Sequence, residues 1–536
     1  MAQFLQVLAR ACGRGKGPIA LAMGYVRVRC ESLSLTYSIL QKQNGSFLLP
    51  QAGEDEVPLS GPIQFSEATL SSTTGTSQNP ALDNEGPIAK FFRATEIDPR
   101  MLGMIAALLL VWAIFDFWSG IISPDAGLLG GSFLTPRNLW TLLVQTSSIA
   151  VMSSGMVLLI VMRQIDLSVG SMLSLIAVGT AVVQVYQLSP TLGVGHPAIW
   201  GAGVITCLAL GALIGAFNGF LTAYAKIPAF IVTLGGLIAY SGIAFLLAKG
   251  ETVAPMDQTF EVFGGGVLQS WLGPFWSWLL AGLACLAILF GVVNGRRQRI
   301  RFSFPLRPVW AEAFLVAIGS AVVLGTTWVM TSYPWPQGVM EDYAIANNIV
   351  IPPGVEDTDG AAICMAGDQV VHCTTGLINY AGFSLPALIA IFVCLVMTFI
   401  ATRTSFGRYV YAAGGNPEAA ELAGINTRWL TVKVFALMGL LVGVSSIISS
   451  ARLNAATNNL GLFSELYVIA ATVIGGTALS GGVGTIYGAM IGALMMQSII
   501  SGMSLLNLPA AYQNIVVGTV LVLAVYLDQL YRRNIK

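Results

Sequence analysis

Charged residues are scarce in this chain. Lysine, arginine, aspartate and glutamate make up 10% of its 536 residues and balance to a formal net charge of zero, so nothing in the composition points to nucleic acid. Histidine occurs only at His196 and His372, which argues against a histidine-based metal or catalytic site. The seven cysteines show no C-x-x-C spacing of the kind used for zinc or redox chemistry. We therefore expect no metal and no catalytic residue in this chain.

An ATP-binding signature is also missing. No stretch of the sequence fits the pattern G-x-x-x-x-G-K-[ST], in which backbone N–H groups and a lysine hold the phosphates. The apolar runs are nearly free of ionisable groups, whereas secondary transporters usually keep such groups within the bilayer for coupled ions. The driving force is therefore expected from outside this chain, with ATP and magnesium bound by another subunit and no cofactor bound here.

Long apolar runs dominate what is present. Hydrophobic residues make up 55% of the chain, and runs long enough to cross a bilayer recur from Met101 onward. We predict an all-α fold, a polytopic helical bundle of the membrane with roughly twelve spans. The expected spans are 101–119, 139–162, 168–187, 199–225, 229–248, 273–294, 309–330, 383–401, 430–450, 465–479, 484–505 and 511–530.

Positive charge is distributed unevenly between the connections. With the N-terminus inside, the inside connections hold most of the arginines, and five of these lie between Gly295 and Pro308. The outside connections hold few cations, chiefly Arg137, Lys249 and Arg452. This asymmetry predicts a multi-pass protein with both termini in the cytoplasm. The arginine-rich connection is expected to determine this topology and, secondarily, to contact anionic membrane lipid; direct contact with the ATP-binding subunit is the alternative.

Two segments differ from the apolar body. Residues 1–95 are rich in Ser, Thr, Gly, Gln and Asn and lack a run of span length. We expect there a disordered cytoplasmic extension, or translated sequence upstream of the true start; a folded regulatory domain is the alternative. The connection 332–380 is acidic and lies outside in this topology. Its Cys364 and Cys373 could pair in an oxidising compartment or stay free, and the sequence leaves this open.

Small residues recur at every fourth position in two distant runs. The two sets are Gly211, Gly215 and Gly219, and Gly484, Gly488 and Gly492. On a helix, this spacing places the members of a set on one face and lets two backbones approach closely in lipid. We interpret both sets as helix-packing sites.

A few polar groups interrupt the expected spans. The candidates for the lining of a pathway are Gln145, Asn218, Tyr240 and Asn459. Each of them could equally satisfy a hydrogen bond between helices. The segment RQIDLSVGS places Asp166 and Ser168 near the inside face, where both could cap the helix that follows. A transport role for Asp166 is the alternative interpretation.

The segment GGNPEAAELAGI (414–425) has the pattern of a short soluble helix within this apolar chain. Asn416 suits the N-cap, Pro417 the first helical position and Gly424 a left-handed stop. About seven helical residues span about 10 Å, which is too short to cross a membrane. On the inside face, such a helix suits either docking to a soluble partner or an interfacial position without one.

The chain resembles the permease subunits of bacterial sugar ABC importers of the ribose, galactose and xylose group. The resemblance is carried by VMRQIDLSVGSMLSL (161–175), GRYVYAAGGNPEAAELAGI (407–425), the run from ARLNAATNN to IGAL (451–494) and YQNIVVGTVLVLAVYLD (512–528). The linked motif G-G-N-x-E-A-A-x-L-x-G-I is the specific part. An insertion of about 130 residues looks like the xylose permease branch, so the resemblance implies D-xylose or another pentose as the substrate.

The resemblance also implies an organisation and a set of partners. A permease core of the type II importer kind would occupy 96–250 and 383–536, and 251–382 would form an insertion with two extra spans and the acidic outer loop. Two permease copies would form the pathway in the bacterial inner membrane. Two ATPase subunits would bind inside, and a periplasmic sugar-binding protein would deliver the sugar from outside. The chain itself would translocate sugar without being catalytic.

The short helix would then be the coupling helix that contacts the ATPase. The residues that match the motif of the family are Gly415, Asn416, Glu418, Ala419, Ala420, Leu422, Gly424 and Ile425. Two other functions stay open. A secondary sugar transporter or facilitator would work without an ATPase, and a non-transporting receptor or scaffold would leave this helix without a partner.

Overall fold

The structure is a computed structural model that describes residues 87–96, 98–122, 131–336, 339, 363–366, 369–372 and 380–535. The chain divides into two units, Met1–Asn79 and Pro80–Lys536, and all described residues belong to the second. Most of the extension expected at 1–95 therefore lies outside the described residues. Its last part was wrongly predicted, because Pro87–Thr95 forms the helix α3. There Phe91 packs against Trp310 and Phe314 of another helix, with ring centroids 6.0 and 5.4 Å away.

Ten helices in the described part of the chain are long and apolar enough to cross a membrane, which confirms the predicted polytopic helical fold. They are α4 (Pro99–Ile122), α5 (Pro136–Val161), α6 (Val169–Ala181) with its continuation through η2 (Val182–Leu188) and α7 (Ser189–Leu192), α8 (Pro197–Ala223), α9 (Ala229–Ala248), α11 (Gly273–Arg301), α12 (Val309–Thr331), α14 (Leu385–Arg403), α17 (Thr427–Leu453) and α19 (Ile486–Leu505).

Two further apolar helices stand where the remaining two spans were expected. They are α18 (Ser464–Ile474) and the first part of α20 (Ala510–Ile535). The expected span 465–479 is cut short because the chain turns at Gly475 and Gly476, and Gly476 has a φ of 86°. The smaller helical elements are α10 (Gln258–Glu261), η3 (Val262–Gly264), η4 (Leu268–Ser270), α15 (Ser405–Gly415) and α16 (Pro417–Leu422).

A two-stranded antiparallel hairpin lies in the connection that was expected to be the acidic outer loop. Its strands are β1 (Ile363–Ala366) and β2 (Gln369–His372), with Cys364 opposite Val371. The sequence did not predict this hairpin. Cys373 lies outside the described residues, so the structure does not test its pairing with Cys364.

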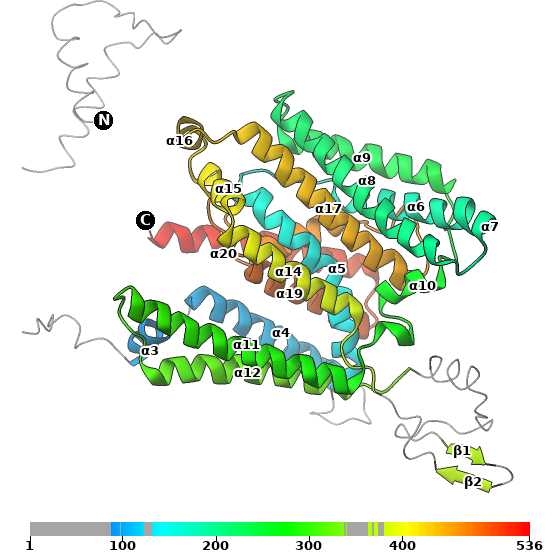
Figure 1. Cartoon of the computed structure of the whole chain (residues 1–536), viewed down its shortest axis with the longest axis horizontal. Coiled ribbons are helices and arrows are strands. Elements are labelled where there is room, and N and C mark those ends of the chain that lie inside the picture. The colour runs from blue at the N-terminus through cyan, green and yellow to red at the C-terminus, as the bar shows by residue number, and fades with distance from the viewer. Residues whose placement is uncertain are drawn as a thin grey trace, which may run out of the picture. The chain divides into compact units, whose positions relative to one another are not determined.

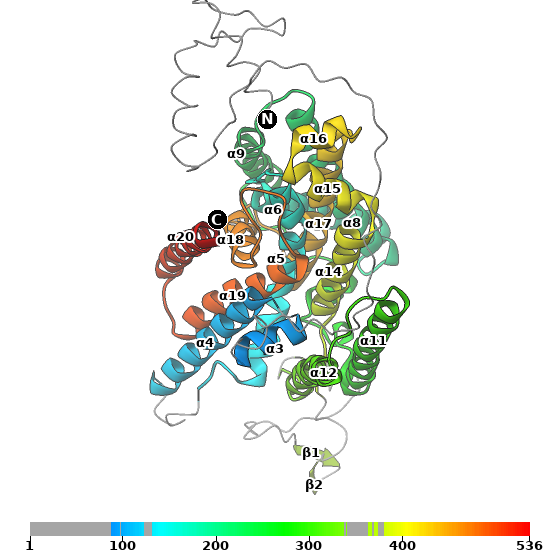
Figure 2. The same cartoon turned by 90° about the vertical axis from the view of Figure 1, so that its left-hand side faces the viewer.

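The interior of the second unit is formed around α5 and α17. In its apolar window, α5 is 89% buried and α17 is 72% buried, whereas α4 is only 6% buried and must find its apolar neighbours in lipid or another chain. Figures 1 and 2 show α5 and α17 between the pair α8 and α9 on one side and the pair α11 and α12 on the other. In Figure 1, α3, α16 and the end of α20 lie at one end of the bundle, while α7 and α10 lie at the other.

The first glycine set packs as predicted. A methyl group on Gly211 would overlap the carbonyl oxygen of Gly439, and one on Gly215 would overlap that of Phe435. Gly219 lies against Phe435 and Val432 in the same way. All three glycines therefore bring the backbone of α8 into direct contact with α17.

The second glycine set packs α19 against α18, with one correction. Gly488 and Gly492 face the backbone of Gly475 and Ala471 too closely for a side chain. Gly484 does not share their helix face, because α19 begins at Ile486, after Thr485 has capped it by accepting from the N–H of Gly488.

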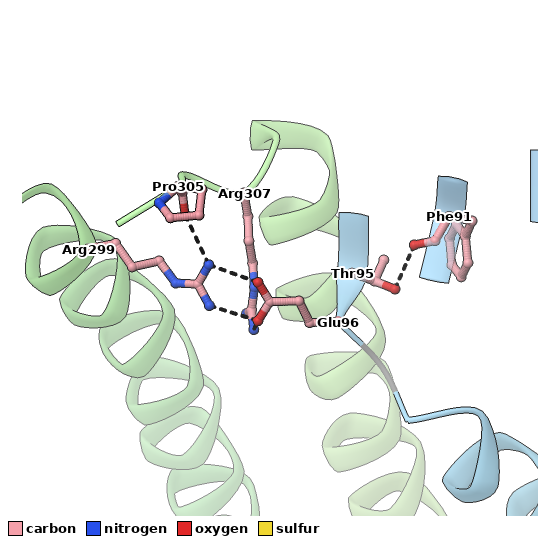
Figure 3. Close-up of polar contacts among 6 residues, drawn as sticks. All are labelled: Phe91, Thr95, Glu96, Arg299, Pro305 and Arg307. Atoms are coloured by element: carbon pink, nitrogen blue, oxygen red, sulfur yellow. Dashed lines mark hydrogen bonds and ion pairs between the residues drawn. The ribbon is translucent and has the colours of Figure 1, made fainter. Parts of the chain in front are cut away.

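The pair α11 and α12 is attached to the joint between α3 and α4 by an ion-pair cluster (Figure 3). Arg299 donates from both terminal nitrogens to the two carboxylate oxygens of Glu96, at 2.8 and 2.7 Å, and Arg307 donates to Glu96 at 2.6 Å. These two guanidinium groups, Arg299 first, lower the pKa of Glu96 to about 2. A third arginine of the basic connection, Arg296, pairs with Glu312 at 2.7 Å. Three of the five arginines expected to face lipid therefore have carboxylate partners within the chain.

Candidate functional site

The short helix predicted at 414–425 exists as α16, and its start follows the predicted pattern. Asn416 is the N-cap, and its side-chain oxygen accepts from the N–H of Ala419 at 3.0 Å. Pro417 occupies the first turn, where its missing N–H costs nothing. The helix α15 ends one residue before this cap, so α15 and α16 follow each other with a sharp change of direction (Figure 1).

The end of α16 also follows the predicted pattern. Gly424 has a φ of 84°, the left-handed conformation that terminates helices. Its N–H donates to the carbonyl of Glu421 at 2.9 Å, and the N–H of Ile425 donates to that of Ala420 at 3.0 Å. This pair of bonds is the Schellman arrangement, which satisfies carbonyls that a short helix would otherwise leave without donors.

The residues of α16 and its end that match the motif of the family differ in exposure. Ala420 is buried at 5% exposure, whereas Ile425 is half-buried and packs against the protein core. Leu422 is 90% exposed, and Glu418 and Ala419 are exposed beside it. Exposing a leucine this fully loses the gain of burying it, and among the described residues of α16 Leu422 is the large apolar side chain that faces outward.

A groove of about 440 Å³ adjoins the end of α16. Gly424 and Ile425 line one part of it, and Tyr409, Trp429 and Lys433 line another. Trp429 is 49% exposed, and the ammonium of Lys433 lies 5.6 Å from the centre of its ring. The sequence did not single out this groove, because the end of α16 forms it together with residues of α15 and of the first two turns of α17.

Four residues that the sequence singled out separately form one buried polar cluster. The Tyr240 hydroxyl on α9 donates to Asn218 Oδ1 on α8 at 2.6 Å, and Asn218 Nδ2 donates to Ser168 Oγ at 3.1 Å. Ser168 in turn donates from Oγ to Asp166 Oδ1 at 2.6 Å. Asp166 and Asn218 are each 1% exposed. The cluster therefore joins the connection between α5 and α6 to two neighbouring helices.

The two caps predicted ahead of α6 differ in outcome. Asp166 accepts from the N–H of Ser168 at 2.8 Å, so it satisfies a backbone donor directly ahead of the helix. Ser168 is the N-cap by position, but its side chain makes no capping bond to the helix. Its hydroxyl is used by Asp166 and Asn218 instead, so this prediction was wrong.

Asp166 retains one unused oxygen. Its Oδ2 is buried and has no hydrogen-bond partner in the part of the chain that the structure describes. Loss of hydration on burial raises the pKa of the Asp166 carboxyl.

The other two pathway candidates lie apart from this cluster. Gln145 on α5 accepts from Gln497 Nε2 on α19 at 2.6 Å, so it serves a bond between helices. The sequence missed Gln497, which lies within an apolar helix and gave no sign of a partner. Asn459 is exposed before α18 and accepts from Asn458 at 3.0 Å.

Ten apolar helices and a short capped helix exposed between two of them define a polytopic membrane protein. Residues 138–525 match the family described as the permease component of the branched-chain amino acid transport system. The match covers more than half of the chain, and the chain belongs to this family.

Relatives with named substrates belong to sugar transport systems. The xylose transport system permease protein XylH of Escherichia coli K12 is 34% identical over 431 residues, which cover 80% of this chain and 92% of that protein. XylH of Haemophilus influenzae is 32% identical over 441 residues, covering 82% and 98%. The ribose import permease protein RbsC of Escherichia coli K12 is 29% identical over 402 residues, covering 75% and 88%. No solved structure matches the chain. The predicted resemblance to sugar importer permeases is thereby confirmed.

Proposed function

We propose that this chain is the transmembrane permease subunit of an ATP-driven importer for D-xylose or another pentose. The observation that carries the proposal is the similarity to two XylH proteins at 34% and 32% identity over nearly their full lengths. The ribose permease is similar over a smaller share of this chain and at 29% identity, which favours the xylose branch. The chain moves sugar and catalyses no reaction by itself.

The partners follow from the same assignment. Two permease copies form the pathway, two ATPase subunits hold ATP and magnesium on the cytoplasmic side, and a periplasmic binding protein delivers the sugar. The exposed Leu422 on α16 supports this reading, because its side chain is open to burial against a partner surface. The nearly unburied apolar windows of α4, α11 and α12 supply area for lipid and for the second copy.

Orientation and domain layout complete the proposal. Both termini lie in the cytoplasm, so α16 and the basic connection after α11 face the ATPase side of the bacterial inner membrane. Residues 251–382 form the insertion between the two parts of the permease core, 96–250 and 383–536.

Uptake of labelled sugars tests the assignment. Cells without their own pentose transporters would express the chain together with its ATPase and binding protein, or without the ATPase. We expect D-xylose to accumulate only with the complete set, and more than D-ribose or L-arabinose. Without the ATPase, uptake that stops at equal concentrations would establish a facilitator instead, and accumulation would establish a secondary transporter. No uptake of any sugar by the complete set would favour a receptor or scaffold.

A further inference from the structure

Three segments that are distant in sequence meet at the base of α16. They are the end of α5 with Arg163, the end of α15 with Gly414 and Gly415, and the connection between α18 and α19. The N–H of Gly482 in that connection donates to the carbonyl of Val161 at 2.9 Å. A methyl group on Gly414 would overlap the same carbonyl. The backbones therefore touch here, and a displacement of one is resisted by the other two.

Arg163 bonds across this junction. Its Nε donates to the carbonyl of Gly414 at 2.9 Å, and its Nη2 donates to that of Gly415 at 2.8 Å. These carbonyls end α15, where the helix lacks N–H partners and carries the negative end of its dipole. A guanidinium suits this position in both geometry and charge. The next residue, Asn416, is the N-cap of α16, so Arg163 holds the point at which α16 begins.

The backbone at Arg163 has a conformation that glycine usually adopts. Arg163 has a φ of 61°, and its N–H donates to Ile160 while that of Gln164 donates to Leu159. This is the Schellman stop of α5, and the left-handed residue in such a stop is usually glycine. An arginine there carries a conformational cost that glycine would avoid. Among the described residues its partners are carbonyls, and no ion pair there includes it.

The connection between α5 and α6, which contains Arg163, is also held at its other end. Only Gln164 and Ile165 separate Arg163 from Asp166, which bonds to Ser168 and through it to Asn218 on α8 and Tyr240 on α9. The connection between α5 and α6 thus has one end on the base of α16 and the other end on the buried polar cluster.

We propose that Arg163 is a positioning residue that fastens α16 to the α5–α6 connection, so that a displacement of α16 reaches α8 and α9. The inference rests on the proposed function for the origin of that displacement, which is the partner ATPase. The attachments at Arg163 and Asp166 are only three residues apart. A displacement of α16 is therefore transmitted through packed, hydrogen-bonded groups rather than through a loose loop.

Hydrogen exchange of the purified full-length chain tests the attachment without any partner. The variant Arg163→Gly keeps the left-handed stop and removes the guanidinium, and Arg163→Lys keeps the charge. Arg297→Ala removes an exposed arginine from the end of α11 and serves as the control. We expect amides 416–425 to exchange about tenfold faster in Arg163→Gly, less so in Arg163→Lys, and unchanged in the control. Unchanged exchange in Arg163→Gly would overturn the attachment.

Sugar-stimulated ATP hydrolysis in vesicles tests the transmission, with D-xylose and the binding protein added to the reconstituted complex. Arg163→Gly should copurify with the ATPase as the wild type does, yet lose most of the stimulation, and Arg163→Lys should restore part of it. Full stimulation in Arg163→Gly would contradict the positioning role. A wild-type complex that shows no stimulation would contradict the proposed function instead, while the exchange result would still decide the attachment.

Discussion

Gly215 lies on α8 where it faces the backbone of α17, and a methyl group there would overlap the carbonyl oxygen of Phe435. Gly215→Ala should therefore push the two helices apart and destabilise the folded chain by about 1–3 kcal/mol, the usual cost of overpacking. Thermal unfolding of the detergent-purified chain measures the effect.

Gly235 on α9 is the matched control, because a methyl group there would meet nothing within 4 Å. Gly235→Ala should leave the unfolding temperature unchanged or raise it slightly, since alanine favours a helix by about 0.5–1 kcal/mol over glycine. Equal effects of the two substitutions would show that α8 and α17 do not pack through Gly215.

Glu96 is expected to give the attachment of α3 a defined pH dependence. Its pKa is lowered from 4.5 to about 2, chiefly by Arg299 and then by Arg307, so the folded chain favours the charged carboxylate. The stabilisation is fully present above pH 4.5 and is lost as the pH falls toward 2. Hydrogen exchange of residues 87–95, corrected for intrinsic rates, should show equal protection of the amides at about pH 7.5 and about pH 5.5. The protection should decrease below about pH 4.5.

Glu96→Gln is the control for this pH dependence. The variant cannot ionise, so its α3 should exchange faster than wild type above pH 4.5 and should lose the pH-dependent component. If the α3 amides of the wild-type chain lose protection between about pH 7.5 and about pH 5.5, which is above the expected window, the Glu96 assignment is contradicted.

Single residues were predictable from sequence where their partners are near in the chain. Asn416 caps a helix through an N–H three residues on, and Gly424 stops that helix within one turn. The role of Ser168 was predicted wrongly because its hydroxyl oxygen accepts from Asn218, which lies 50 residues away in the sequence. The partners of Arg163 lie 251 and 252 residues away, so its local sequence gave no indication of them.

At the scale of elements, α16 should contact the ATPase through Leu422. Because that side chain is 90% exposed, Leu422→Ala should not change the unfolding temperature of the chain. It should weaken binding to the ATPase by about 1–3 kcal/mol if the leucine becomes buried there. Copurification of the tagged chain with the ATPase, at several salt concentrations, measures the loss.

The matched control is Leu453→Ala, at the opposite end of α17 from α16. Leu453 is 52% exposed and should leave copurification unchanged. If Leu422→Ala retains the ATPase as well as Leu453→Ala does, α16 is not the docking helix, even though its fold is as predicted.

Elements were predictable where apolar length or capping decides them. The long helices follow from runs of hydrophobic residues, and α16 follows from its proline and glycine boundaries. The length of α18 was overestimated because the pair Gly475 and Gly476 ends it inside an apolar run. The helix α3 was missed because its stability depends on aromatic contacts with α12, more than 200 residues further along the chain.

At the scale of the whole molecule, the sequence predicted a polytopic bundle but could not predict which helices are neighbours. In lipid, small residues permit close packing of two helices, but they do not indicate which helix is the partner. Gly211 and Gly215 thus indicated an interface, but only the structure assigns α17 to it. The buried cluster around Asp166 could not be predicted for the same reason. Its members come from the α5–α6 connection, α8 and α9, which meet only when the bundle is formed.

The central claim is that this chain couples ATP hydrolysis by a partner to the movement of a pentose. Its most direct test is a vesicle that contains the purified permease and ATPase, with the binding protein and labelled D-xylose on the periplasmic side. We expect D-xylose to accumulate across the membrane only when ATP is supplied to the ATPase side, and hydrolysis to rise when sugar-loaded binding protein is added. Accumulation without ATP, or hydrolysis that sugar-loaded binding protein leaves unchanged, would contradict the account.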